Sequence, residues 1–276
     1  MSASPIADVE KDDRASAAGI ALDVLYDNHA EYIARRDPLS FEARQILLEV
    51  VTFKIPHLLS VIPDGFNYRS ISEVGCATGE LIASYPEYGP DGDVLEKYGF
   101  DISPSNIKEA KNRYRNVTFS DAQFYDGPAV DVVVLSDILE HVPDDVDFLR
   151  RAGESASLVL VNLPLEDNWL NLRRPYGFSD KSGHLRRYTE EAGRALVVRA
   201  GLRIVSCVRV WSHETSYDVE RRMLREQLLG SQYSGTWPVR CLKTLVHGLA
   251  RGCRPFGRRL YPSNLIMSAA RVDQTR

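Results

Sequence analysis

The sequence predicts an α/β fold in which a doubly wound, mostly parallel, seven-stranded sheet is covered by helices on both faces. From residue 70 onward, short runs of β-branched residues alternate with amphipathic stretches. The short runs are apolar almost throughout, as in strands that are buried on both faces. With 276 residues, 44% of them hydrophobic, the chain is long enough to bury such a core.

The same periodicities place each element in order. Apolar residues at helical spacing predict helices ahead of the sheet, at 15–36 and 40–53, after a loose tail over 1–14. The strands are expected at 70–74, 98–102, 117–120, 130–135, 158–162, 204–210 and 265–270. The intervening helices are expected at 80–85, 105–114, 146–151 and 190–200, and the last of these begins after Thr189, a residue type that caps helices.

The interval 212–262 breaks the alternation and is predicted to be a basic helical insertion before the last strand. Its apolar stripe is formed by Trp237, Val239, Leu242, Leu245, Val246 and Leu249, and its cations are Arg240, Lys243, Arg251, Arg254, Arg258 and Arg259. Three interpretations stay open: a lid helix packed on the core, a membrane-surface helix over 237–259, and a nucleic-acid contact. The chain then divides into an N-terminal tail with lid helices (1–67), a core (68–211), the insertion (212–262) and a last strand with its tail (263–276).

Charge and composition exclude several classes of function. The formal net charge is -4, but 12 Lys and Arg and 5 Asp and Glu lie from Arg209 onward, which leaves 22 and 33 in the acidic remainder. An acidic body gives no reason to expect nucleic acid as a partner. The four cysteines and six histidines show no metal-ligand spacing, so we predict no metal site. An acidic start and the lack of a long apolar run predict a cytoplasmic protein.

A glycine-containing turn follows the first strand, in the segment SEVGCATGE over 72–80. Gly75 and Gly79 allow the backbone to approach a ligand closely, with the small Ala77 between them and Glu73 before them. The pattern differs from GxGxxG, which is typical of NAD-binding turns.

Acidic residues follow the next two strands. Asp101, with Ile102 beside it, comes after the second strand, where a carboxylate can accept both hydroxyls of a ribose. Asp121 and Ala122 follow the third strand, and the fourth runs into SDILEHV, which begins at Ser136.

Together these segments resemble class I S-adenosylmethionine (SAM) methyltransferases. The resemblance rests on the glycine turn, with Ala77 in place of the middle glycine, on the Asp-Ala pair, on LEHV, and on SGHLRRYT over 182–189, which is similar to a GHxRxY element. It covers about 68–210 and the last strand, and it implies a Rossmann-like fold with SAM as the cofactor. It also implies cofactor-binding roles for Glu73, Gly75, Ala77, Gly79, Asp101, Ile102, Asp121, Ala122 and Ser136, with Asp121 on the adenine amino group and Ser136 beside the methionine part.

Three side chains are candidates for proton removal from the acceptor. His184 lies in a loop after the fifth strand, on the ligand side of a doubly wound sheet, and its alternative role is to fix that loop. His141 and Asp137 are the next candidates. Arg186 and Arg187 either bind an anionic substrate group or form ion pairs within the protein.

The resemblance implies methyl transfer to an oxygen or nitrogen of a small metabolite or of a sugar or glycan, which could be lipid-linked. Two alternatives remain open: a non-catalytic SAM-fold interaction protein and an NAD(P)-dependent oxidoreductase. The acceptor itself does not follow from these motifs.

Overall fold

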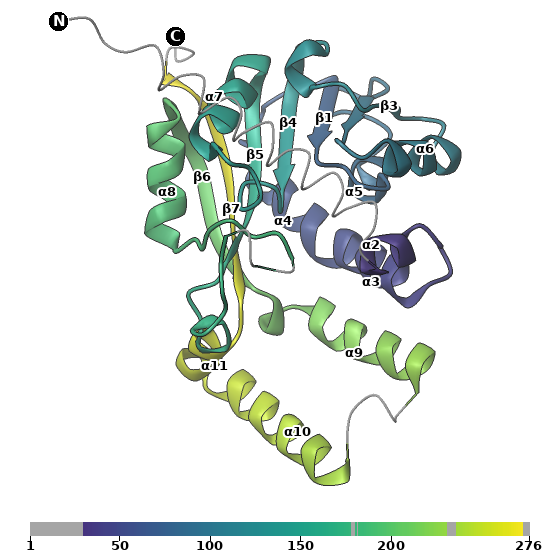
Figure 1. The fold of residues 1–276 in the computed structure, drawn as a ribbon. Helices are drawn as coiled ribbons and strands as arrows, with labels where there is room; N and C mark the ends of the chain where they lie inside the picture. Colours follow the sequence, from purple (N-terminus) through teal and green to yellow (C-terminus); the bar gives the residue numbers. More distant parts are fainter. Residues whose placement is uncertain (1–29, 178–179, 181, 231–235, 273–276) are drawn as a thin grey trace, which may run out of the picture.

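A computed structural model describes residues 30–177, 180, 182–230 and 236–272. Within them, seven strands form one sheet in the order β3-β2-β1-β4-β5-β7-β6, and helices lie on both faces (Figure 1). The first five strands of that order are mutually parallel, whereas β7 is antiparallel to both β5 and β6. The predicted fold class is therefore confirmed. The expected tail and residues 15–29 of the first predicted helix lie outside the described residues.

The strands are close to their predicted positions. They are β1 (Ser70–Val74), β2 (Glu96–Phe100), β3 (Thr118–Ser120), β4 (Val130–Ser136), β5 (Ala156–Leu165), β6 (Leu202–Trp211) and β7 (Ser263–Arg271). The prediction for the second strand was wrong by two residues, because pairing with β1 begins at Glu96 and ends at Phe100. Asp101 and Ile102 consequently lie in the loop beyond the strand.

Alternating side chains divide the core between the two faces of the sheet. In β4, Val132 and Val134 pack in one cluster while Val133 and Leu135 pack in the other. The first face is covered by α5 (Glu80–Ser84), α6 (Pro104–Arg113) and the N-terminal helices, and the second by α7 (Asp145–Ser155) and α8 (Glu190–Arg199). Burial on both faces explains why the central strands β4 and β5 are apolar almost throughout.

The N-terminal helices pack beside the carboxyl ends of the strands. They comprise α2 (Ala30–Arg35), α3 (Phe41–Glu49), the π-helical turn η1 (Val50–Lys54) and α4 (Ile55–Ser60). The Ser40 hydroxyl caps α3 by accepting a hydrogen bond from the Ala43 amide. Phe53 of η1 is buried in the first core cluster, and this anchors the neighbouring Lys54 near the sheet.

The insertion consists of the short turn η4 (Ser212–Glu214), followed by α9 (Ser216–Leu229), α10 (Trp237–Gly252) and α11 (Arg254–Leu260). Together, α9 and α10 extend from the end of the sheet as an arm (Figure 1). Tyr217 joins α9 to the N-terminal helices through a hydrogen bond to Glu49, and His247 of α10 contacts Asp218 of α9 at 3.1 Å.

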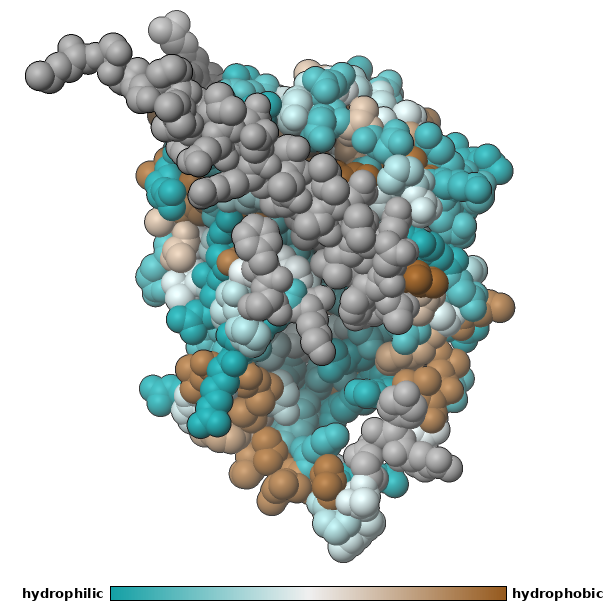
Figure 2. Space-filling model, in the orientation of Figure 1, coloured by the Kyte–Doolittle hydropathy of each residue, from teal (hydrophilic) through white to brown (hydrophobic). Residues whose placement is uncertain are grey.

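The interpretation of α10 as a lid helix whose apolar stripe packs on the core was wrong. Most of its large apolar side chains are exposed, by 75% at Trp237 and about 60% at Leu242 and Leu245. Figure 2 shows hydrophobic surface at this end of the molecule. The face that α10 buries carries His247 and Ala250 instead. Two of the expected surface cations, Arg254 and Arg258, form ion pairs with Glu214.

Candidate active site

A cavity of about 540 Å³ opens where the parallel strands β1, β2 and β4 end. Its walls are formed by the turn after β1, the loops after β2, β3 and β4, the loop with His184, and side chains of α3 and η1. The carboxyl edge of a doubly wound sheet is where such folds bind ligands, and the volume lies within the usual range for small-molecule sites.

The glycine turn forms one wall of the cavity. Gly75, Ala77 and Gly79 all have positive φ angles, of 78°, 46° and 89°. A Cβ atom at Gly75 would lie 2.5 Å from the Ile138 side chain. Glycine at this position therefore keeps the turn against the loop that follows β4, with backbone exposed to the cavity.

Asp101 holds the glycine turn in position. Its carboxylate accepts hydrogen bonds from the Ala77 amide at 2.8 Å and from the Ser103 amide at 2.9 Å. Asp101, Ile102 and Ala122 all line the cavity, whereas Asp121 is exposed and is not among the lining residues. The structure therefore brings Asp101, Ile102 and Ala122 to one cavity but leaves Asp121 outside its wall.

Glu73 is buried beneath the turn. One of its carboxylate oxygens accepts a hydrogen bond from the Ile82 amide in α5 at 2.9 Å. Burial raises the pKa of Glu73 to about 8, although Lys54 and this hydrogen bond act in the opposite direction.

Ser136 and Asp137 belong to a polar network at the end of β4. Asp137 adopts a positive φ of 53°, and one of its carboxylate oxygens receives the Ser136 hydroxyl, the Asn162 amide group and the Lys54 ammonium at 2.8–3.0 Å. Burial alone would lower the pKa of Lys54, but the attraction of Asp137 and Glu49 outweighs it and raises that pKa. Asp137 thus fixes η1 to the sheet, which argues against a role in proton removal.

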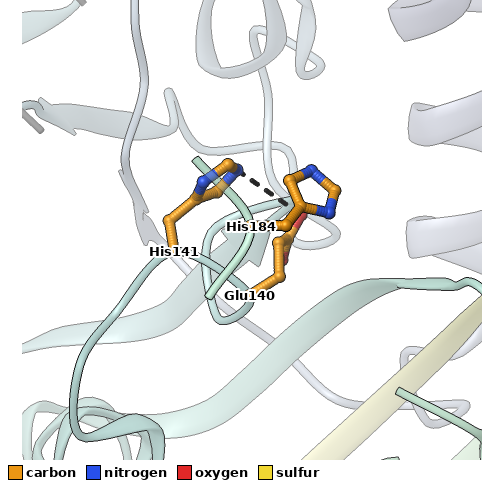
Figure 3. Close-up of side chains that lie close together, drawn as sticks. All are labelled: Glu140, His141 and His184. Carbon is orange, nitrogen blue, oxygen red and sulfur yellow. Dashed lines mark ion pairs between the residues drawn. The ribbon is translucent and has the colours of Figure 1, made fainter. Parts of the chain in front are cut away.

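The two candidate histidines lie together although they are 43 positions apart in the sequence. The rings of His141 and His184 meet edge to face with centroids 4.8 Å apart, and Glu140 lies beside them (Figure 3). His141 Nδ1 bonds to the Gly183 carbonyl at 3.0 Å, and His184 Nδ1 to Glu166 Oε2 at 3.2 Å. All three side chains line the cavity.

The electrostatic setting of this cluster is unusual. Burial, with a contribution from Asp137, raises the pKa of Glu140 well above its ordinary range. Burial and the neighbouring His184 lower the pKa of His141 to about 4. The imidazole of His141 is therefore neutral near pH 7 and can act as an acceptor or a ligand.

Arg186 has a structural role and is not placed to bind a substrate anion. Its guanidinium donates to the carbonyls of Leu139, Val142 and Pro143, and it lies 3.5 Å from Asp145. These contacts fix the LEHV loop. Arg187 is exposed.

Several wall residues were not predicted from the sequence. They are Arg35, Glu49 and Lys54 from the N-terminal helices, with Gln123, Phe124, Phe148 and Pro164 from the loops and helices around the cavity. The signal for Lys54 was weak, because a lone lysine at the end of an amphipathic segment is usually exposed.

Comparisons with known proteins are consistent with this geometry. A family model described as a methyltransferase domain matches residues 52–207, which is more than half of the chain. A search of curated proteins gives no match.

Among solved structures, the cyclopropane synthase MmaA2 from Mycobacterium tuberculosis is similar with a TM-score of 0.53 and 15% identity, over 90% of this chain and 97% of that one. An O-methyltransferase of a trans-AT PKS multienzyme from Brevibacillus brevis, in complex with S-adenosyl-L-homocysteine, has a TM-score of 0.52 and 13% identity over 84% and 76%. Magnesium protoporphyrin IX methyltransferase from Synechocystis PCC 6803, with bound SAM, has a TM-score of 0.51 and 15% identity over 92% and 97%. At these identities, the likeness establishes the fold.

Proposed function

The chain belongs to the methyltransferase-domain family, and from this premise we propose that it transfers a methyl group from SAM to an oxygen or nitrogen of a small metabolite or glycan. Family membership makes it a SAM-dependent methyltransferase and sets the oxidoreductase alternative aside. The observation that carries the proposal is that a single cavity is lined both by the glycine turn and by the two histidines.

The residues around the turn fit SAM. Gly75 and Ala77 line the cavity with left-handed backbone, and a side chain at Gly75 would collide with Ile138 on the loop after β4. Asp101 and Ile102 line the same cavity. Glu73 and Gly79 support the turn, and Ser136 and Ala122 contribute further wall, whereas Asp121, the expected partner of the adenine, is not part of that wall. When bound, SAM supplies a methyl carbon that is already electrophilic.

The chain's own task is then to align the acceptor and to promote loss of its proton. His184 and His141 are the groups that we assign to that step, because both face the cavity and each is fixed at Nδ1. Asp137 orients its surroundings through Lys54 and Asn162, and its role is therefore positional.

The test is the transfer of radiolabelled methyl from SAM to fractions of a cell extract. We expect His184→Ala to lower turnover by about 10²–10⁴ while SAM affinity stays nearly unchanged. His57→Ala, which changes a histidine outside the cavity, is the control. SAM binding without label transfer to any fraction would favour a non-catalytic binding protein, and equal turnover in His184→Ala would give that histidine a structural role.

The acceptor class and location are also part of the proposal. Exposed apolar residues of α10 beside Arg240, Lys243 and Arg251 fit contact with an anionic membrane surface over 237–259, where a lipid-linked acceptor would be within reach. Four unpaired cysteines fit the reducing conditions of the cytoplasm, and we do not expect nucleic acid as a partner. Among the described helices, none has both the length and the apolarity to cross a membrane.

A further inference from the structure

We propose that Glu140, His141 and His184 form a binding site for one divalent first-row transition-metal ion. One potential ligand atom from each residue lies within 4.8 Å of the other two, and Figure 3 shows the three side chains together. Two residues come from the loop after β4 and the third from the loop after β5. The sequence spacing therefore gave no sign of a ligand set.

The two imidazoles are held in the way that metal-ligating histidines usually are. Such a ligand commonly donates one ring N–H to a carbonyl or carboxylate, which fixes the ring and leaves the other nitrogen to bind the ion. His141 meets this condition through the Gly183 carbonyl, and His184 through Glu166. Arg174 pairs with Glu166 and Asp180, so the outer carboxylate is itself fixed.

Glu140 provides an independent indication of a bound cation. The residue is only 2% exposed, and its Oε2 atom has no hydrogen-bond partner among the described residues. A buried carboxylate oxygen without a partner is costly, and a cation in the cavity would remove that cost. Asp137, by contrast, is already held by Lys54 and Asn162 and is not part of the proposed ligand set.

The donor set indicates the class of ion. Two imidazole nitrogens and one carboxylate oxygen suit zinc, cobalt or iron better than magnesium or calcium, which prefer oxygen ligands. Bonds of about 2.0–2.2 Å place ligands roughly 3.5 Å apart. The three atoms would therefore approach one another by about 1 Å through side-chain rotation.

The proposed metal site would take part in the proposed methyl transfer. The binding of the ion does not depend on that function, whereas its catalytic role rests on it. A cation there would bind the acceptor's oxygen or nitrogen and lower the pKa of the group that loses its proton. The histidines would then promote proton loss as ligands, and the proton would pass to solvent.

The test is titration of the full chain, stripped with a chelator, with Co²⁺ alone. We expect one equivalent to bind, with visible ligand-field absorption and displacement by Zn²⁺. His184→Ala and Glu140→Gln should weaken binding about a hundredfold or more, and Glu166→Gln by about 10–100-fold, the range for outer partners of a ligand.

His247→Ala is the matched control, because His247 is also buried beside a carboxylate, that of Asp218. This variant should bind Co²⁺ as tightly as the wild type. A wild-type protein that gives no Co²⁺ absorption would overturn the proposal, as would His184→Ala that binds as tightly as the wild type. Since neither SAM nor acceptor is present, failure of this experiment is distinct from failure to transfer a methyl group.

Discussion

The carboxylate of Asp101 accepts a hydrogen bond from the Ala77 amide and also lines the cavity that we propose as the SAM site. We expect Asp101→Ala to weaken SAM binding by about 1.5–3 kcal/mol, the range for hydrogen bonds to a charged group, as measured by calorimetry. Asp121→Ala is the comparison, and it should lose less SAM-binding free energy because the Asp121 side chain lies outside the cavity wall. Unchanged affinity in Asp101→Ala would remove the assignment of the ribose site.

Glu73 makes stability depend on pH. Its pKa is about 8 in the folded chain because of burial, and near the ordinary 4.5 in the unfolded chain. Between these values the folded state keeps a proton that the unfolded state has lost, so the free energy of unfolding falls as pH rises through this window.

Glu73→Gln should abolish that contribution. The difference in unfolding free energy between about pH 5 and about pH 8, measured with urea, should be smaller in the variant than in the wild type. Glu226→Gln, at an exposed site on α9, controls for the loss of one carboxylate. Parallel pH dependences in Glu73→Gln and the wild type would contradict the shifted pKa.

Among the helices and strands, α10 is unusual because an amphipathic helix normally buries its apolar face, whereas α10 leaves most of its large apolar side chains exposed. If its exposed stripe contacts an anionic membrane, Leu242→Glu combined with Leu245→Glu should reduce co-sedimentation with anionic vesicles. Each surface cation adds about 1 kcal/mol of attraction, which salt screens. Val198→Glu, at a similarly exposed apolar position on α8, is the control. A wild-type chain that stays in the supernatant at low salt would exclude membrane contact.

The η1 element illustrates what local sequence patterns miss. The periodicity of 40–53 predicted a helix there, but the π-helical turn and the ion pair between Lys54 and Asp137 depend on docking of that helix against the end of β4. Sequence periodicity reports which face is buried and carries no information about the partner across the interface.

For the whole molecule, the sheet could be predicted because each buried strand is a compact apolar run followed by a turn. The glycine turn and Asp101 could be placed for the same reason, since parallel strands end at one edge. The cluster of Glu140, His141 and His184 depends on how two distant loops meet. Whether the apolar stripe of α10 faces the core or the solvent depends on how the helix packs, which the local sequence pattern does not encode.

The position of β7 between β5 and β6 affects how the protein must be made. β6 joins the sheet through β7, which is separated from it by the whole insertion. At about 5–20 residues per second, synthesis of the roughly 60 residues from the end of β6 to the end of β7 takes about 3–12 s. During that interval a nascent chain leaves the edge of β5 open and β6 unpaired, a state that invites pairing with other chains. The length of the insertion therefore sets how long the edge of β5 and the strand β6 stay unpaired during synthesis.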